Sequence, residues 1–462
     1  MSSLAELLFA DELEPADVAV YFGDSSVTRA ELVSRAGSIA EDLVAHGVTT
    51  GQAVAVRLPN SIELIATLFG VWKAGAVYVP VNPRLTPTEI ARTLDAVRPA
   101  AFIGDDDWKP TDEPARHEPD IALVQFTSGT TGRPKPVLLR HSGVLALLDG
   151  VIGSLRTKPA AERKAPMPNL IPVSLSLWAG IYQVLFAFRV EAPVVVMETF
   201  ATKSFAETVR RFGIRSTVLP PAAMTMLSDD TSIDDLAPLK YVRSISAPLS
   251  PLQARRFQQR FGITVLNGYG QTEIGGEIIG WSAAAAKEFG ETKLGSVGRP
   301  HDGVSVRADE VGELQVQTPA LSAGYADGVD LSDRMTADGW FRTGDIGRVD
   351  DDGFVWIEGR VSDMINRGGL KVFPEEVAEV LRLSPSVADA AVAAAPDERL
   401  GEVPWAFVVP VGNAVDVDEL LALCREHLAP YKVPARIEVV DALPRNEIGK
   451  VMTAPLVAGV HR

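Results

Sequence analysis

Apolar and polar residues near the N-terminus alternate with the periodicity of a surface helix. Apolar side chains recur every three or four positions between Leu32 and Leu43, which is the spacing of one buried helical face. Thr28 and Glu31 precede this stretch with the spacing of a capping box, in which each side chain satisfies the other residue's backbone amide. We therefore predict a helix from about 29 to 45.

Short continuous apolar runs then alternate with helical patterns. The runs 53–58 and 76–79 enclose an apolar helical stretch that ends near Ala74, before a glycine. A strand, a helix and a second strand in this order need a crossover connection, which favours a parallel sheet covered by helices. The segment 98–120, rich in proline and acidic residues, is predicted to be a loop. Downstream the same alternation predicts strands at 121–126, 192–197, 216–219 and 264–266 and a helix at 205–212.

After Val311 the pattern changes to alternation with period 2. The segment 312–317 alternates in this way, and 344–349 and 354–357 flank an Asp-rich turn. These segments predict antiparallel hairpins that form a small β-barrel-like part. The pattern changes again after Arg360, to a compact mixture of elements. The elements predicted there are helices at 374–383 and 416–428 and strands at 390–394 and 405–409.

The predicted fold class is α/β. Residues 1–361 are expected to form a large N-terminal domain of mostly parallel sheets flanked by helices, together with the small β-barrel-like part. Residues 362–462 are expected to form a small α+β C-terminal domain, which is an ordinary size for an independent folding unit.

Charge and cysteine content narrow the range of partners. The 462 residues include 44 Lys and Arg against 60 Asp and Glu, a net charge of −16 that repels nucleic acid and anionic membrane surfaces. Any polyanionic ligand therefore needs a local site. The single cysteine, Cys424, follows Leu420 on the apolar face of a predicted helix, so we expect it to be buried rather than reactive. With no apolar run of ~18 residues and no basic leader, we predict a cytoplasmic protein without an integral membrane segment or a nucleic-acid partner.

The strongest chemical signal is the segment 127–136, TSGTTGRPKP, directly after the predicted strand 121–126. Consecutive small residues let backbone N–H groups turn toward one point and form an anion nest, and Lys135 adds a charge. The proline before Lys135 and the absence of a following Ser or Thr distinguish this segment from a P-loop. Alone, such a loop is more often a solvated turn, so its assignment as a phosphate site depends on further motifs.

Four further segments carry candidate chemistry. In 267–273, NGYGQTE, glycines beside an aromatic residue leave its ring open to a flat base, and Glu273 can hold a divalent cation beside phosphates. In 340–345, WFRTGD, the carboxylate of Asp345 can accept hydrogen bonds from two ribose hydroxyls. Taken singly, 267–273 is also compatible with a hairpin turn, and 340–345 is more often a surface turn. The remaining segments are IEGR at 357–360 with RGGLKVFP at 367–374, and PRNEIGK at 444–450.

In this order the motifs TSGTTGRPK, NGYGQTE, TGD, GRVSDMI and PRNEIGK resemble those of the adenylate-forming superfamily of acyl-CoA synthetases, peptide-synthetase adenylation domains and luciferases. The milder match LPNSIELIATLFGVWKAGAVYVPVNP at 58–83 extends the resemblance over nearly the whole chain. It implies that a carboxylate attacks the α-phosphate of MgATP to give an acyl-adenylate and pyrophosphate, and that a thiol then displaces AMP. It also implies a mobile C-terminal domain that pivots near Ser362, where relatives commonly have Asp or Lys.

The resemblance implies a role for each matched residue. The segment 127–135 would hold the β- and γ-phosphates, and Thr272 would contact the α-phosphate. Lys450 would reach the α-phosphate and the carboxylate from the C-terminal domain. Thr272, Glu273 and Lys450 are thus the predicted catalytic residues, and Glu273 is also the predicted metal ligand, for Mg²⁺.

The nucleotide itself is expected to lie on the second and third motifs. Tyr269 would pack against the adenine, Asp345 would bind the ribose hydroxyls, and Arg360 would lie near the ribose. The full set of predicted cofactor-binding residues is Thr127, Ser128, Gly129, Thr130, Thr131, Gly132, Lys135, Ala247, Pro248, Asn267, Gly268, Tyr269, Gly270, Gln271, Asp345, Arg360, Gly368 and Gly369.

The segment 367–371 resembles the CoA-using branch of the superfamily, in which small residues such as Gly368 and Gly369 let the pantetheine arm pass. The predicted cofactors are therefore ATP, Mg²⁺ and CoA, and the predicted partner is a small carboxylic acid. Two alternatives stay open: a stand-alone adenylation enzyme that loads a carrier protein, and a non-catalytic nucleotide-binding homologue. The retained Lys450 and Asp345 argue against the second. A homodimer also stays open.

Departures from the family pattern define the predicted substrate pocket. Leu175 stands where relatives often have a histidine, and no Asp is present between Pro172 and Gly180 to pair an ammonium, which disfavours amino acids as substrates. The sequence Ser-Ile-Ser-Ala-Pro-Leu at 244–249 stands where relatives typically read Ser-Gly-Gly-Ala-Pro-Leu. Residues predicted to line the pocket are Trp178, Ile245 and Ser246.

Ile245 has two equally weighted interpretations, because a strand residue faces either the pocket or the sheet core. If its side chain limits the length of the acid, Ile245→Gly will extend pyrophosphate release to longer acids, at ~10-fold or more per methylene admitted. The measurement is the rate of pyrophosphate release over an aliphatic series. An unchanged chain-length profile would place Ile245 in the core.

Overall fold

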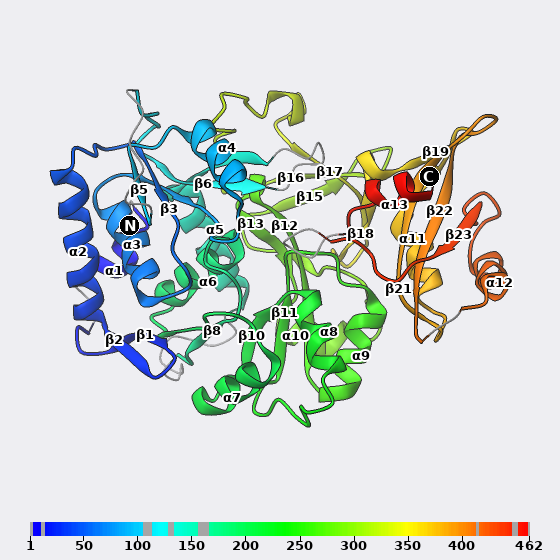
Figure 1. Ribbon diagram of the computed structural model, residues 1–462, viewed down its shortest axis with the longest axis horizontal. Helices are drawn as coiled ribbons and strands as arrows, with labels where there is room; N and C mark the ends of the chain where they lie inside the picture. Colours follow the sequence, from blue (N-terminus) through cyan, green and yellow to red (C-terminus); the bar gives the residue numbers. More distant parts are fainter. Residues whose placement is uncertain are drawn as a thin grey trace.

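The computed structural model describes residues 3–10, 14–104, 113–127, 134–155, 166–412, 415–445 and 451–460. Their strands form five sheets, flanked by helices (Figure 1). The N-terminal elements and the C-terminal elements lie at opposite ends of the long axis in this view, and the two chain termini are correspondingly far apart. The predicted α/β fold class is confirmed.

The first sheet has the order β5-β3-β4-β6-β7 and is parallel except for the last pair. Its strands are β3 (Ala53–Val56), β4 (Val77–Pro80), β5 (Ala101–Ile103), β6 (Ile121–Thr127) and β7 (Lys135–Arg140). The preceding and intervening helices are α1 (Glu6–Phe9), α2 (Arg29–Ala45), α3 (Ile62–Lys73) and α4 (Pro87–Val97). The capping box predicted for Thr28 and Glu31 is present at the start of α2.

One prediction in this region is wrong. The segment 98–120 was expected to be a loop, but it contains β5, which pairs in parallel with β3. The strand has only three residues, of which Phe102 is buried, so it is too short to stand out against its acidic and proline-rich surroundings.

Two further sheets combine parallel and antiparallel pairs. One has the order β2-β1-β9-β8 and the other the order β10-β11-β12-β13-β14. Their strands are β1 (Val18–Phe22), β2 (Ser25–Thr28), β8 (Asn169–Ile171), β9 (Val194–Val196), β10 (Ser216–Leu219), β11 (Tyr241–Ser244), β12 (Thr264–Gln271), β13 (Gly276–Gly280) and β14 (Arg299–Pro300). The helices around them are α5 (His141–Leu155), α6 (Trp178–Arg189), α7 (Thr202–Phe212), α8 (Pro221–Asp229), α9 (Pro251–Phe261) and α10 (Ala283–Phe289).

Strand β12 is longer than the apolar run 264–266 predicts. It continues through the NGYGQ residues as far as Gln271 and pairs there with β13. The sequence pattern missed this extension because its glycines carry no apolar side chains. At Gly270 the two strands approach so closely that a Cβ atom would lie 1.7 Å from the carbonyl oxygen of Gly276, so only glycine fits.

The antiparallel hairpins predicted after Val311 are present as the sheet β15-β16-β17-β18. Its strands are β15 (Ser305–Ala308), β16 (Glu313–Gln317), β17 (Phe341–Val349) and β18 (Val355–Arg360). Strand β17 starts early enough to include the TGD motif, so Asp345 lies within a strand and not in a surface turn.

The C-terminal elements have a sheet and an apolar core of their own. They are β19 (Ile365–Arg367), β20 (Leu370–Val372), α11 (Pro374–Leu381), β21 (Val387–Asp397), β22 (Gly401–Pro410), α12 (Val417–His427), β23 (Arg436–Val439) and α13 (Ala454–Val460). Cys424 is fully buried in this core, as predicted, and burial raises the pKa of its thiol to about 11. The boundary at 361/362 and the mobility of this part stay predictions. Among the described residues, no helix combines the length and apolar composition needed to cross a membrane.

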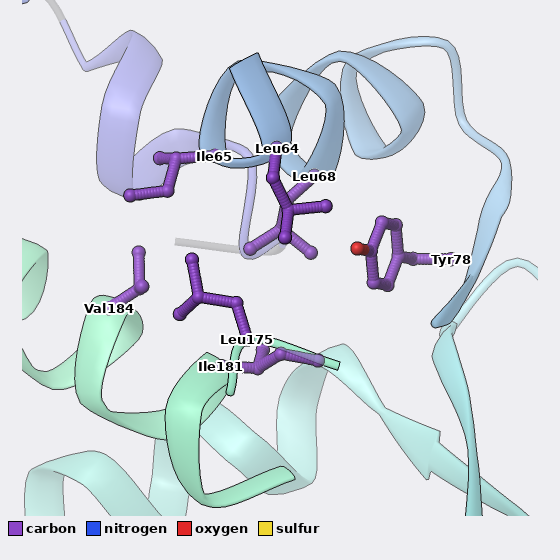
Figure 2. A pocket seen from close by; sticks show the side chains of 7 residues that line it. All are labelled: Leu64, Ile65, Leu68, Tyr78, Leu175, Ile181 and Val184. Atoms are coloured by element: carbon purple, nitrogen blue, oxygen red, sulfur yellow. The ribbon is translucent and has the colours of Figure 1, made fainter. Parts of the chain in front are cut away.

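Apolar side chains fill the space between α3 and α6 (Figure 2). No gap between these side chains is wide enough for a water molecule. Leu175 belongs to this packed region and is only 3% exposed, so the position where relatives often have a histidine is part of the core here. The side chains are Leu64, Ile65 and Leu68 from α3, Ile181 and Val184 from α6, Leu175 before α6, and Tyr78 from β4.

Asn60, which is buried, holds the loop that contains Leu175. Its amide nitrogen donates to the carbonyl oxygens of Val173 and Met197, at 3.0 and 2.9 Å, and its oxygen accepts from the Leu175 amide at 2.8 Å. Three main-chain groups thus depend on a single side chain.

We expect Asn60→Ala to lower the free energy of unfolding by ~2–4 kcal/mol, because it leaves buried main-chain groups without partners. Urea denaturation measures the difference. The control is Gln317→Ala, which removes one exposed hydrogen bond of 3.4 Å to Gly339 and should change stability by less than ~0.5 kcal/mol. Equal effects of the two substitutions would contradict this account of Asn60.

Candidate active site

Asp345 on β17 is the centre of a buried hydrogen-bonded cluster, and its residue is 3% exposed. One carboxylate oxygen accepts from Nε of Arg360 at 2.9 Å. The other accepts from the hydroxyl of Tyr269 and from Nε2 of Gln271, both at 2.6 Å. Three strands supply these side chains, β12, β17 and β18, which meet near the middle of the molecule (Figure 1).

Strand register explains why these residues meet. Asp345 and Arg360 face each other directly across the antiparallel pair β17–β18, which brings their opposite charges within contact. Tyr269 and Gln271 are two positions apart on β12, so both side chains point to the same face. The motifs NGYGQTE, TGD and GR, separated in sequence, are therefore joined in space, as the family resemblance implies.

The protonation states in this cluster follow from burial and charge. Burial, and then the negative charge of Asp345, raise the pKa of the Tyr269 phenol well above its ordinary value, so it stays a hydrogen-bond donor at neutral pH. Burial lowers the pKa of Arg360, but the charges of Asp345 and Asp363 outweigh burial and raise it overall. A carboxylate offers about four lone-pair sites, and the described residues use three at Asp345.

A second carboxylate, Glu273, lies in the short 3₁₀ helix Thr272–Ile274 that follows β12. Its Oε1 atom accepts from the Tyr325 hydroxyl at 3.3 Å and lies 3.6 Å from a guanidinium nitrogen of Arg334. On the other side of Tyr325, the ammonium of Lys135 lies 5.4 Å from the centre of the ring, a cation–π contact. Lys135 from the first motif and Glu273 from the second therefore converge on one tyrosine.

Arg334 connects the two carboxylates. Its Nη2 atom donates to the carbonyl oxygen of Thr343 at 2.7 Å and to Oε1 of Gln271 at 3.4 Å, while Nη1 faces Glu273. The sequence analysis missed both Arg334 and Tyr325. Neither residue lies in a glycine-rich motif. The sequence signal that could have indicated them is their position shortly before the TGD motif, in the segment that connects β16 to β17.

The charges fit a magnesium nucleotide better than an all-protein metal site. Among the residues that the structure describes, no group of three or more His, Cys, Asp and Glu side chains could hold a metal ion. Mg²⁺ is usually held by one or two carboxylates together with substrate phosphates and water. Glu273, buried and bonded to the same tyrosine that Lys135 contacts, has the chemistry for such a shared site.

Several predicted site residues lie either outside the described residues or away from the Asp345 cluster. Ser128, Gly129, Thr130, Thr131, Gly132 and Lys450 lie outside the described residues. Thr127 ends β6 and lies opposite Lys135 in the β6–β7 pair. Gly368 and Gly369 form the turn between β19 and β20, with φ angles of 59° and 91°, and lie in a different sheet from Asp345. The structure therefore does not join this glycine pair to the Asp345 cluster.

The predicted substrate-pocket residues follow β11 and begin α6. Strand β11 ends at Ser244, and the next residues, Ile245 to Pro248, continue without regular structure. Ile245 is half-buried, and Ser246 has a φ of 75°, a left-handed conformation that suits the glycine typical of relatives at this place. Trp178 is 8% exposed, and its indole N–H donates to the carbonyl oxygen of Gly275 at 2.8 Å.

Asn267 and Gly268, at the start of the second motif, lie in the middle of β12. The Asn267 side-chain oxygen accepts from the Gly268 amide at 3.1 Å, and Asn267 is the register partner of Ser244 on β11. Gly268 is followed directly by Tyr269, so the two strands bring the segment after Ser244 close to the aromatic residue of the nucleotide motif.

Comparison with known proteins agrees with this geometry. The model of the AMP-binding enzyme family matches residues 10–114 and 104–326, and that of the AMP-binding enzyme C-terminal domain matches residues 376–450. A 2-succinylbenzoate–CoA ligase of Geobacillus sp. (strain WCH70) is 31% identical, over 95% of this chain and 94% of the relative. A feruloyl-CoA synthase of Amycolatopsis sp. is 32% identical, over 95% of both.

Solved structures of one enzyme show the same fold with ligands. The o-succinylbenzoate CoA synthetase MenE from Bacillus subtilis, in complex with the acyl-adenylate intermediate OSB-AMP, superposes with a TM-score of 0.85 at 25% identity, over 99% of this chain and 98% of MenE. The same enzyme has been solved with ATP and a magnesium ion, with a TM-score of 0.84, 25% identity and 97% coverage of both chains. Because both family models match and the relatives align over nearly the full length, the chain belongs to the adenylate-forming family of AMP-binding enzymes.

Proposed function

We propose that the protein is an ATP-dependent acid–thiol ligase. It activates a carboxylic acid as an acyl-adenylate with release of pyrophosphate, and then transfers the acyl group to CoA. The observation that carries this proposal is the convergence of the motif residues on two carboxylates, Asp345 and Glu273; Arg334 contacts Glu273 directly and the Asp345 cluster through Gln271. Relatives named as CoA ligases support the choice of acceptor.

The Asp345 cluster is suited to the ribose of the nucleotide. Its carboxylate is buried and held in place from two strands by Tyr269, Gln271 and Arg360, so it needs no rearrangement to accept a hydroxyl. A fixed acceptor in a region of low dielectric constant binds a hydroxyl more strongly than a mobile, solvated one. We assign the ribose to this cluster and the adenine to the neighbouring ring of Tyr269.

The phosphates belong on the side of Tyr325. Lys135 supplies a cation there, Glu273 supplies a metal ligand, and Thr272 lies next to Glu273 with its hydroxyl available to the α-phosphate. Bound Mg²⁺ neutralises phosphate charge and so makes pyrophosphate a better leaving group. The chain's own contribution is to hold the triphosphate in one orientation between these side chains.

The C-terminal part would complete the site. We propose that residues 362–462 move as a unit about Ser362 and carry Lys450 to the reacting carboxylate. Ser362 suits this role in position, because it lies in an exposed 3₁₀ turn between β18 and β19. In a second orientation, Gly368 and Gly369 would line the path of the CoA thiol, where their lack of side chains leaves room. With ATP and CoA as substrates, we place the enzyme in the cytoplasm.

A coupled assay tests the function. Pyrophosphate release across aliphatic, aromatic and dicarboxylic acids reports adenylate formation, and mass spectrometry with CoA present reports the thioester. Adenylate formation with a thioester only on a carrier protein would exclude CoA as the acceptor. No pyrophosphate release with any acid would exclude the ligase and favour a non-catalytic homologue.

Lys450→Ala is expected to reduce pyrophosphate release by ~100-fold or more while ATP affinity stays within about threefold, because its charge acts on the reacting centre and not on the adenosine. Isothermal titration gives the affinity. Lys203→Ala, at an exposed position on α7, is the matched control and should leave both quantities unchanged. Full activity of Lys450→Ala would remove this residue from the mechanism.

Asp345→Asn is expected to weaken ATP binding by ~10–100-fold, because it replaces an anionic acceptor that also orients Arg360 and Tyr269. The control is Asp149→Asn, which breaks an exposed ion pair with Arg189 on the surface. Unchanged ATP affinity in Asp345→Asn would mean that the ribose lies elsewhere.

A further inference from the structure

A second buried polar cluster lies beside the proposed nucleotide site. Arg243 on β11 and Glu277 on β13 form an ion pair in which the side chains are only 13% and 12% exposed. Nη2 of Arg243 also donates to the carbonyl oxygen of Trp281 at 2.9 Å, and Nε2 of His301 lies 3.4 Å from the same Glu277 oxygen that Arg243 contacts. None of these residues belongs to a motif of the family.

Two glycines make room for this cluster. A Cβ atom on Gly268 would lie 2.8 Å from the carboxyl carbon of Glu277, and one on Gly280 would lie 2.4 Å from its Oε1 atom. Both distances are shorter than carbon or oxygen atoms tolerate. Gly268 directly precedes Tyr269, so the Glu277 carboxylate lies one residue away from the aromatic side chain assigned to the adenine.

An aromatic pair from α6 faces the same region. The rings of Trp178 and Tyr182 are one helical turn apart and pack edge to face with 5.9 Å between their centres. Trp178 is anchored to Gly275, two residues before Glu277. A Cβ atom on Gly276 would lie 2.7 Å from the indole nitrogen, so α6 and β13 are in close contact here.

The hydroxyl of Tyr182 is the feature that calls for a ligand. It is buried, and within the described part of the chain it has no hydrogen-bond partner. Burial, and then the negative charge of Glu277, raise the pKa of this phenol, so it is a hydrogen-bond donor at neutral pH. Leaving a buried donor without a partner costs ~1–3 kcal/mol, so such groups usually mark a site that something else fills.

The charges of the cluster restrict what fills it. Burial raises the pKa of Glu277, but Arg243 and His301 outweigh burial and lower it, so the carboxylate is ionised and its charge is compensated by Arg243. A buried ammonium or a second carboxylate on the ligand would have no opposite charge to pair with. A neutral hydroxyl group on the ligand adds no charge, and it can accept a hydrogen bond from Tyr182 and donate one to Glu277.

We propose that Tyr182 and Glu277 form the far wall of the acid pocket and select carboxylic acids that carry a hydroxyl group on an aromatic ring. This inference rests on the proposed ligase function and adds the class of acid to it. The hydroxyl of the acid would lie at Tyr182 and Glu277, with its carboxylate toward the nucleotide. Tyr182 and Glu277 act as specificity-determining residues, because they contact the far end of the acid and not the reacting carboxyl group.

The test compares two acids that differ by one hydroxyl, 4-hydroxycinnamic acid and cinnamic acid, in the pyrophosphate-release assay with the full-length enzyme. We expect kcat/KM to be ~10–100-fold higher for the hydroxylated acid, mainly through a lower KM, because a site with an unpaired buried donor rejects a ligand that lacks the partner. Tyr182→Phe should reduce this preference to about threefold or less, chiefly by lowering kcat/KM for the hydroxylated acid.

Two further variants separate specificity from stability. Glu277→Gln should reduce the same preference, and Tyr21→Phe, at a tyrosine of β1 that packs against Phe212, should leave it unchanged. If Glu277→Gln does not fold, Tyr182→Phe still decides, because removing one hydroxyl keeps the ring in place.

Failure of the inference is distinguishable from failure of the function. Equal kcat/KM for the two acids, or an unchanged preference in Tyr182→Phe, overturns the inference, and the ligase function stands as long as some acid releases pyrophosphate. If aliphatic or dicarboxylic acids release pyrophosphate but neither 4-hydroxycinnamic acid nor cinnamic acid does, the inference is likewise overturned and the ligase function stands. If no acid of any class releases pyrophosphate, both the proposed function and this inference are wrong.

Discussion

The buried carboxylate of Asp345 is the constraint on which the arrangement of the site depends. An unpaired charge at this depth would be strongly unfavourable, so β12 and β18 have to bring Tyr269, Gln271 and Arg360 to it. That requirement fixes the register of β17 against β18 and the position of the strand that carries the nucleotide motif. The same contacts that satisfy the charge during folding leave its oxygens aligned for hydroxyl groups of a ligand.

Glycine positions in β12 and β13 connect this cluster to the second buried cluster. The close approach at Gly270 fixes the hairpin, and the missing side chain at Gly268 leaves space for the carboxylate of Glu277. Tyr269 between them faces Asp345. One strand thus carries the proposed nucleotide site on one side and the proposed acid pocket on the other, an arrangement that would bring the two reacting groups together without a flexible linker between them.

The sequence was sufficient for most of the fold and for half of the site. Capping residues and apolar periodicity predicted α2, α3 and the strands beside them, because these signals are local. Strand β5 and the extension of β12 were missed, since three apolar residues or a run of glycines carry no periodicity. Asp345 and Arg360 were found through motifs, whereas Tyr325, Arg334 and the Arg243–Glu277 pair are defined only by tertiary contacts between distant segments.

The protein has an overall charge of −16, and the cations of the candidate site are themselves close to carboxylates or an aromatic ring. Arg360 is paired with Asp345, Arg334 faces Glu273, and the ammonium of Lys135 lies over an aromatic ring. Two of these three site cations therefore face carboxylates, and an ATP molecule entering without a metal would add several negative charges next to those carboxylates. Entry as the magnesium complex would remove part of that charge, and the proposed movement of Lys450 into the site would supply the rest only when the acid is also present. A site with its cations compensated in this way would bind the complete set of reactants better than free triphosphate, which would favour productive complexes over binding of nucleotide alone.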